Sequence, residues 1–255
     1  MKNPPASIEI LTPEWPAPPQ VRAACTLRAG GASKPPYDTF NLGAHVGDDP
    51  QAVAHNRGVL NPALRLPAEP AWMEQVHGIE VLDLDSPGSA ARAAGADAAF
   101  TRLEGKVCVV QIADCLPVLL SARDGSVVAA AHAGWRGLAA GVLEATVHRL
   151  AIDPRMLIAW LGPAIGPAHF EVGEEVRRAF LAHDTAAAGA FVANERGRWQ
   201  CDLPALARAR LSALGVSAVS GGSWCTYADP ARFFSYRRDG RCGRMAALIW
   251  REAWQ

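Results

Sequence analysis

The sequence has no long hydrophobic run and no excess of charge of either sign. Half of its 255 residues are hydrophobic, yet the longest uncharged apolar runs stop well short of the roughly 18 residues that a membrane helix needs. The 25 basic and 25 acidic residues balance, so bulk electrostatics favour neither nucleic acid nor an anionic membrane as a partner. These absences predict a globular protein with a sizeable core and no transmembrane segment.

Paired cysteines and a secretion signal are also missing. The six cysteines are scattered without a C-x-x-C pair, which argues against a disulfide framework and predicts reduced thiols. The N-terminal residues reach Pro13 without the apolar segment that a secretory signal needs. We therefore expect a cytoplasmic protein that is a monomer or a weak homo-oligomer, without nucleic-acid or membrane partners.

Strand-like and helix-like segments alternate along the chain without a break in composition or an internal repeat, which predicts a single α/β domain over residues 1–255. Strands are expected where short apolar runs lie between turn signals, and helices where apolar residues recur every three to four positions. The expected strands cover residues 21–27, 79–84, 106–112, 127–132, 156–161 and 245–250. One expected helix begins at residue 50, and the others span residues 138–150, 174–183 and 203–214. Residues 184–197 lack a clear pattern and are expected to form a mobile excursion.

The stretch from Val110 to Leu138 combines buried strands with chemically reactive side chains. Two apolar runs of strand length fill it, with Cys115 in the first run and His132 at the end of the second. A glycine-rich bend after His132 leads into the expected helix, so backbone N–H groups and Arg136 are expected to gather at the helix start. A thiol and an imidazole are therefore placed at the ends or kinks of neighbouring buried strands, which is a common way to build a reactive site.

A second histidine, His77, precedes Gly78 where the chain bends into the next expected strand. Together, His77, Cys115 and His132 offer two nitrogen ligands and one sulfur ligand, a set that can hold catalytic zinc and leave a fourth position for water. The local spacing does not identify this set, because no H-x-x-x-H or C-x-x-C pattern joins the three residues. On the residues alone, a metal site, a Cys–His thiol pair and an inert core all remain open.

A series of short motifs follows in order along most of the chain, between Val21 and Trp250. The motifs are Thr26-Leu-Arg-Ala-Gly-Gly-Ala-Ser33, Asn41-Leu-Gly, Val46-Gly-Asp48, Gln75-Val-His-Gly78, Ala113-Asp-Cys-Leu-Pro117, Ala131-His-Ala-Gly-Trp-Arg-Gly137, Leu161-Gly-Pro-Ala-Ile-Gly166 and Phe234-Ser-Tyr-Arg-Arg-Asp239. Together they resemble the bacterial laccase-domain family, first labelled multicopper polyphenol oxidase and now assigned as purine nucleoside phosphorylase. One departure is Cys242, where members of that family often carry threonine, and we expect it to change packing rather than chemistry.

The resemblance implies a fold, a metal and an activity. The fold is a layered α/β/β/α sandwich, similar to the catalytic domain of the necrotising-factor deamidase toxins. The metal is zinc, bound by His77, Cys115 and His132, which are also the implied catalytic residues. The activity is phosphorolysis of adenosine, inosine and S-methyl-5'-thioadenosine, which releases the base and ribose or methylthioribose 1-phosphate. Hydrolytic deamination of adenosine is a second implied reaction.

Four further residues are candidates for the site. Asp114, next to Cys115, is a candidate proton shuttle or orienter of a metal ligand, and a role in the turn fits its position equally well. Phosphorolysis needs cations around the phosphate, so Arg28 is the first candidate for phosphate binding and Arg136 is the second. Asn41 is expected to hydrogen-bond the base or the ribose.

Three other functions remain open. A copper-dependent phenol oxidase (Cu²⁺), the older assignment of the family, would need several copper centres, and seven histidines without an H-x-H pair argue against that arrangement. A metal-free enzyme in which His132 activates Cys115 for deamidation or hydrolysis fits the similarity to the toxins but leaves His77 unexplained. The third is a non-enzymatic factor in peptidoglycan precursor editing.

Overall fold

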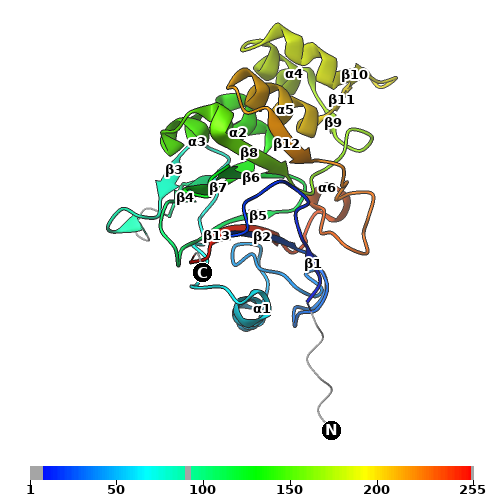
Figure 1. Cartoon of the computed structure of the whole chain (residues 1–255). Helices are drawn as coiled ribbons and strands as arrows, with labels where there is room; N and C mark the ends of the chain where they lie inside the picture. The colour runs from blue at the N-terminus through cyan, green and yellow to red at the C-terminus, as the bar shows by residue number, and fades with distance from the viewer. Residues whose placement is uncertain (1–7, 90–92, 254–255) are drawn as a thin grey trace.

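The computed structural model describes residues 8–89 and 93–253. Two β-sheets lie face to face, and helices cover the outer face of each sheet (Figure 1). The smaller sheet is antiparallel and has the strand order β1-β2-β13-β5. Helix α1 (Pro50–Leu64) packs against its outer face. The strands of this sheet are β1 (Ile10–Leu11), β2 (Val21–Thr26), β5 (Val107–Ile112) and β13 (Met245–Arg251).

The larger sheet has the order β12-β8-β6-β7-β4-β3. Its four central strands are antiparallel, whereas β12 and β3 pair in parallel with their neighbours. The strands are β3 (Val81–Asp83), β4 (Ala98–Thr101), β6 (Leu116–Ala122), β7 (Val128–Ala133), β8 (Leu157–Leu161) and β12 (Ala218–Gly221). The helices over its outer face are α2 (Trp135–Ala140), α3 (Val142–Leu150) and α5 (Leu203–Ala213).

A small three-stranded sheet, in the order β10-β11-β9, extends from this helical layer together with α4 (Figure 1). Its pairings are antiparallel. Its elements are β9 (Glu171–Val172), α4 (Glu174–Leu181), β10 (Phe191–Ala193) and β11 (Trp199–Cys201). The short helix α6 (Tyr236–Asp239) precedes β13, and single 3-10 turns cover Pro154–Met156 and Thr185–Ala190.

Apolar side chains of the central strands alternate between the layers of the core. On β5, Val109 packs in the cluster beneath α1, whereas Val110 packs in the cluster between the two sheets. On β6, Leu119 joins that inter-sheet cluster, whereas Leu120 packs beneath α3 and α5. Successive side chains of a strand point to opposite faces, so a fully apolar strand must be covered on both sides. The α/β class is confirmed, with layers in the order helix, sheet, sheet, helix.

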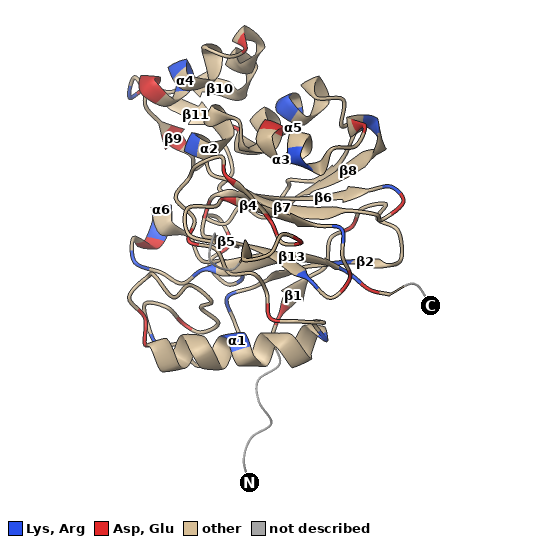
Figure 2. Cartoon of the chain, turned by 90° about the vertical axis from the view of Figure 1, so that its left-hand side faces the viewer, with Lys and Arg blue, Asp and Glu red and all other residues tan. Residues whose placement is uncertain are grey.

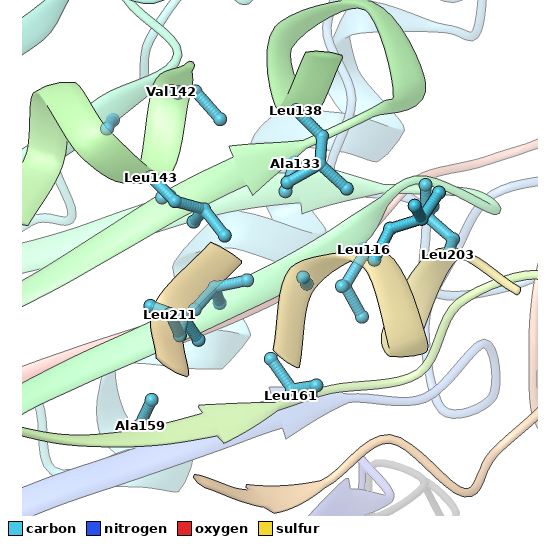
Figure 3. Packing of buried hydrophobic residues seen from close by; sticks show 14 of the residues in the cluster. Leu116, Ala133, Leu138, Val142, Leu143, Ala159, Leu161, Leu203 and Leu211 are labelled. Atoms are coloured by element: carbon cyan, nitrogen blue, oxygen red, sulfur yellow. The ribbon is translucent and has the colours of Figure 1, made fainter. Parts of the chain in front are cut away.

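Figure 3 shows the layer between the larger sheet and its helices. Leu143 of α3 and Leu211 of α5 belong to one buried cluster with Leu116 and Leu161 of the sheet. This packing holds the ends of β6 and β7 under the helical layer, which matters because the candidate site lies at those ends. The single domain and the similarity to the toxins stay predictions.

Most of the expected elements are confirmed, with slightly different ends. The helix expected from Pro50 is α1, and the Asp49 side chain caps it by accepting a hydrogen bond from the Gln51 backbone N–H at 2.9 Å. The expected strand at residues 79–84 is present but shorter, as β3. The other expected strands, and the helices at residues 174–183 and 203–214, correspond to β2, β5, β7, β8, β13, α4 and α5.

Three segments differ in detail from the sequence pattern. The helix expected over residues 138–150 is two helices, because Gly141 takes a left-handed conformation (φ 105°) that ends α2 and starts α3. The first apolar run is divided between two sheets, since the chain bends between Ile112 and Leu116. Residues 184–197, expected to form a mobile excursion, contain a short 3-10 helix and β10, whose partner β11 follows.

Acidic and basic residues are interspersed along the helices and loops (Figure 2). Across residues 8–89 and 93–253, no helix combines the length and apolar character that crossing a membrane requires. The sequence-based expectation about the first residues of the chain concerns residues 1–7, which lie outside the described part. The predicted cytoplasmic location therefore stays a prediction.

Candidate active site

The side chains of His77, Cys115 and His132 converge at one end of the larger sheet. Cys115 directly precedes β6, and His132 lies on the neighbouring strand β7, opposite Pro117. His77 comes from a bend earlier in the chain, and its Nε2 lies 3.6 Å from Cys115 Sγ. The ligand atoms of the three residues all lie within 4.8 Å of one another. The fold therefore brings together three side chains that no sequence spacing connects.

Asp97, at the start of β4, organises both histidines. Its side chain is fully buried, and its Oδ1 accepts a hydrogen bond from His132 Nδ1 at 2.8 Å and one from the His77 backbone N–H at 3.0 Å. Its Oδ2 accepts from the backbone N–H groups of Val76 and Gly78 at 3.1 and 2.7 Å. Because Nδ1 of His132 donates to this carboxylate, Nε2 is left as the ligand atom. The same contacts hold His77 in its left-handed conformation (φ 62°).

Gly134 leaves the space that two of the three side chains occupy. A Cβ atom at this position would lie 2.8 Å from Cδ2 of His77 and 2.9 Å from Sγ of Cys115. Both distances are shorter than real Cβ contacts, so a larger residue would displace a ligand side chain. The glycine that follows β7 is thus a requirement of the site rather than of the turn alone.

The pKa values of Cys115 and His132 differ from those that burial alone would give. Burial alone would raise the pKa of the Cys115 thiol, but the positive charge of His132 and hydrogen bonds with His132 and His77 lower this pKa to about 6. Burial alone would lower the pKa of His132, but Cys115 and Asp97 raise it to about 9. By contrast, burial raises the pKa of the Cys25 thiol to about 12. Cys115 is therefore held as a thiolate, the form that binds metals and attacks electrophiles.

The carboxyl group of Asp97 keeps its negative charge despite its burial. Burial would raise its pKa, but hydrogen bonds from His132 and from the backbone N–H groups of Gly78 and Val76 lower it below the usual range. This buried carboxylate faces His132 and balances the positive charge of its imidazole. Sequence analysis missed Asp97, because it stands alone before an apolar strand and only the fold joins it to the histidines.

A cavity of about 570 Å³ opens onto the three side chains, within the usual range of about 300–1,000 Å³ for small-molecule sites. One part of its wall is apolar and is formed by Trp135, Ile165 and Phe170. Apart from Ala113, the remaining lining residues are polar or charged and are His45, Gln75, Gln111, Asp114, Arg136, Tyr236, Arg237 and Arg244. An organic molecule with an apolar ring and polar substituents matches this wall.

Of the residues predicted to bind phosphate or the nucleoside, the fold places Arg136 at the cavity but not Arg28 or Asn41. Arg136 lines the cavity, is exposed, and stacks 4.5 Å from the centre of the Trp135 ring. Arg28 and Asn41 are not found among the described residues that line the cavity. The Arg28 guanidinium group donates hydrogen bonds to the backbone oxygens of Asp38 and Pro230. Its charge is thus engaged in holding loops together.

Asn41 also serves the surrounding loops. It is fully buried; its Nδ2 donates to Gly43 O and Asp48 Oδ2, and its Oδ1 accepts from the backbone N–H groups of Gly43 and Arg244. Arg244 lines the cavity, so Asn41 acts on the site through the position of this residue. The substrate contacts predicted for Arg28 and Asn41 stay predictions, and their hydrogen bonds favour supporting roles.

Asp114 lines the cavity and lies at the bend between β5 and β6, with a left-handed backbone conformation (φ 97°). Its Oδ1 accepts a hydrogen bond from Thr226 Oγ1 at 2.6 Å, and its Oδ2 accepts one from the Arg237 backbone N–H at 2.7 Å. The carboxylate thereby ties the bend that carries Cys115 to the C-terminal loops. This geometry favours a positioning role, and the predicted proton transfer stays a prediction.

Replacing Asp114 with alanine is expected to lower the free energy of unfolding by about 1–3 kcal/mol, because the Thr226 hydroxyl and the Arg237 N–H would lose their acceptor. Denaturant unfolding measures this change, and Thr226→Val is the matched control that removes one of the two contacts. Asp114→Asn keeps the shape of the side chain and one of its two acceptors, so it should destabilise the protein less than Asp114→Ala while removing the basic oxygen. Unchanged turnover per folded Asp114→Asn molecule would rule out proton transfer, whereas a loss of about 10²–10⁴-fold with zinc still bound would support it.

Comparisons with known proteins find relatives that match almost the whole chain. The chain is 54% identical over 241 residues to a purine nucleoside phosphorylase of Pseudomonas aeruginosa, which covers 94% of this chain and 97% of the relative. It is 52% identical over 242 residues to the purine nucleoside phosphorylase YfiH of Escherichia coli, covering 95% of this chain and 98% of that one.

Solved structures are similar over the same length. The crystal structure of a Neisseria meningitidis protein matches with a TM-score of 0.90 and 45% identity, covering 96% of this chain and 99% of that chain. YlmD from Geobacillus stearothermophilus matches with a TM-score of 0.83 and 31% identity, covering 98% of this chain and all of that chain. The family profile described as multi-copper polyphenol oxidoreductase laccase matches residues 22–252. The chain therefore belongs to this laccase-domain family, as the order of its motifs predicts.

Proposed function

We propose that the protein is a zinc-dependent purine nucleoside phosphorylase with a second activity as an adenosine deaminase. Its substrates are adenosine, inosine and S-methyl-5'-thioadenosine, and phosphate receives the ribose or methylthioribose. The observation that carries the proposal is a single cavity in which His77, Cys115 and His132 share a wall with an unpaired arginine and an apolar patch. The names of relatives that match almost the whole chain support it.

The donor set fits zinc. Two imidazole nitrogens and one thiolate are typical of catalytic zinc sites with one open coordination position. The Asp97–His132 hydrogen bond is the contact that usually fixes a metal-binding histidine, and the space left by Gly134 lets the ligand atoms approach. When bound, zinc supplies a positive charge and Lewis acidity at this end of the cavity.

A multicopper oxidase is less well supported than a single-metal enzyme. Among the described residues, His77, Cys115 and His132 form the single group of three or more His, Cys or acidic side chains that could hold a metal. Multicopper chemistry needs several such groups. Copper therefore remains an alternative for the identity of the ion, whereas several copper centres are not part of the proposal.

The residues of the cavity suit the parts of a nucleoside. The apolar side chains of Trp135, Ile165 and Phe170 offer a surface on which a flat purine can pack. Arg136 offers a charge to phosphate, because none of the described residues accepts a hydrogen bond from its guanidinium group. Arg237 and Arg244 also line the cavity, but each already donates to backbone oxygens. Arg136 is thus preferred over Arg28 as the phosphate ligand.

Arg136→Ala is expected to raise the KM for phosphate about tenfold or more, since a hydrogen bond to a charged group contributes about 1.5–3 kcal/mol. Formation of ribose 1-phosphate from inosine at varied phosphate concentration measures this change. Adenosine deamination, which uses no phosphate, should fall much less. The matched control is Arg177→Ala, which removes another arginine stacked on a tryptophan, Trp199, away from the cavity. A higher KM for phosphate in Arg28→Ala but not in Arg136→Ala would reverse the assignment.

The second candidate function is a metal-free hydrolase or deamidase. The observation that favours it is the Cys115 thiolate, whose pKa is held at about 6 by His132 and His77. In this enzyme the Cys115 sulfur would be the nucleophile, activated by its pairing with His132, as the predicted similarity to the toxins suggests. Chelators would leave its activity intact and alkylation of Cys115 would abolish it, which separates it from the zinc enzyme. A non-enzymatic role in peptidoglycan precursor editing would show neither response.

A further inference from the structure

Gln111 lines the cavity and carries an unpaired hydrogen-bond acceptor. It is the penultimate residue of β5 and is only 5% exposed. Its Nε2 lies 3.5 Å from the Met73 backbone oxygen, whereas its Oε1 is buried without a hydrogen-bond partner among the described residues. Buried polar atoms are nearly always paired, so an unpaired one on a cavity-lining residue indicates a missing ligand or water.

The backbone of Gln111 is rigidly held. It pairs with Ala246 of β13 on one side. On the other side, the Gln75 side chain donates to its backbone oxygen at 3.0 Å and accepts from its backbone N–H at 2.7 Å. Gln75 lies two residues before His77, so these bonds also connect the metal-binding bend to the edge of the smaller sheet. The residue that carries the acceptor is therefore held by the sheet rather than by a mobile loop.

We propose that Gln111 Oε1 accepts a hydrogen bond from the 2′- or 3′-hydroxyl group of the nucleoside ribose, an inference that rests on the proposed function. An acceptor needs a donor as its partner, which argues against the phosphate dianion. The base is also a poor partner, because position 6 carries a donor in adenosine and an acceptor in inosine. S-methyl-5'-thioadenosine lacks the 5′-hydroxyl, so the 2′- and 3′-hydroxyls are the ribose donors that all three proposed substrates share.

The geometry of the cavity agrees with this assignment. Gln111 lines the same cavity as the charged residues Arg136, Arg237 and Arg244 and the apolar side chains proposed to hold the base. It also lies four residues before Cys115, across the bend at Asp114. A ribose hydrogen-bonded to Gln111 would therefore lie in the cavity that holds the proposed phosphate and base contacts, as phosphorolysis at the ribose carbon requires.

The test compares wild type and Gln111→Met, which keeps the length of the side chain and removes the acceptor. For each, kcat/KM is measured with inosine, 2′-deoxyinosine and 3′-deoxyinosine. In wild type, kcat/KM should be about 10–100-fold lower for one of the two deoxynucleosides than for inosine. In Gln111→Met, kcat/KM for inosine should fall by a similar factor, whereas kcat/KM for that deoxynucleoside should not change. The matched control is Gln200→Met, whose Oε1 is likewise unpaired but which does not line the cavity, and it should discriminate as wild type does.

The structural alternative gives a different result. If Gln111 only supports the fold, Gln111→Met lowers kcat/KM for all three nucleosides by the same factor, and the inference is overturned. It is also overturned if the variant instead changes the preference between adenosine and inosine, because Oε1 would then face the base. Calorimetric binding of inosine without phosphate gives a second readout. If the wild-type protein binds inosine but does not cleave it, the proposed function is contradicted and the inference about Gln111 is not. If it neither binds nor cleaves inosine, both are contradicted.

Discussion

Replacing Cys115 with serine, or His132 with alanine, is expected to remove most of the bound zinc and to reduce phosphorolysis and deamination to background. Each change removes one of three protein ligands, and a site with two ligands holds zinc far more weakly. Wild-type protein purified without added metal should carry about one zinc ion per chain. Elemental analysis by mass spectrometry measures this content and distinguishes zinc from copper in the same sample. Thermal unfolding should show that both variants remain folded.

Cys225→Ser is the matched control for the cysteine variant. Cys225 is also partly exposed, and its sulfur accepts a hydrogen bond from the Gly166 backbone N–H, a contact that a serine oxygen can make. It does not line the cavity, so its zinc content and activity should equal those of wild type. Full zinc occupancy in both Cys115→Ser and His132→Ala would refute the ligand assignment.

Asp97→Asn is expected to weaken zinc binding about 10–100-fold, the usual effect of losing a carboxylate that orients a metal-binding histidine. It should also lower the free energy of unfolding by about 2–6 kcal/mol. The two carboxylate oxygens accept four N–H groups, and the amide nitrogen of asparagine would face two of these donors without accepting from them. Each unpaired buried donor costs about 1–3 kcal/mol. Competition with a zinc-binding dye and denaturant unfolding measure the two effects.

Asp85→Asn separates the loss of stability from the loss of zinc. Asp85 also uses both oxygens to accept hydrogen bonds, from Thr101 Oγ1 and from the Arg102 backbone N–H, at the far end of β4 from Asp97. Its replacement should destabilise the fold without changing zinc affinity. If Asp97→Asn keeps wild-type zinc affinity, the carboxylate supports the fold and does not tune the metal site.

The closeness of Cys115 and His132 could be predicted because strand pairing follows from local patterns. The apolar runs around Cys115 and His132, separated by a turn, predict neighbouring strands, and β6 and β7 pair as expected. His77 was predicted as a third ligand from its position before a glycine and from the family resemblance. Its distance to Cys115 depends on the packing of a bend against β7, which no local pattern encodes.

The residues that sequence analysis missed act through contacts between distant segments. Asp97 accepts hydrogen bonds from His77 and His132, which are distant from it in the sequence. Gln111 is recognisable only in the structure, because its side-chain oxygen lacks a hydrogen-bond partner among the described residues. Arg28 shows the opposite case. An arginine before a glycine-rich turn is typical of anion sites, but the fold uses its guanidinium group to join two loops. The sequence also does not show that the first apolar run is divided between two sheets. Both halves are buried strands, so their patterns look alike.

The most direct test of the central claim is whether purified protein converts inosine and phosphate into hypoxanthine and ribose 1-phosphate in a zinc-dependent manner. The account predicts that both products form in equal amounts, that a chelator stops their formation, and that added zinc restores it. It would be contradicted by the absence of ribose 1-phosphate from the zinc-loaded protein. Formation that continues unchanged after complete metal removal would contradict the role assigned to His77, Cys115 and His132.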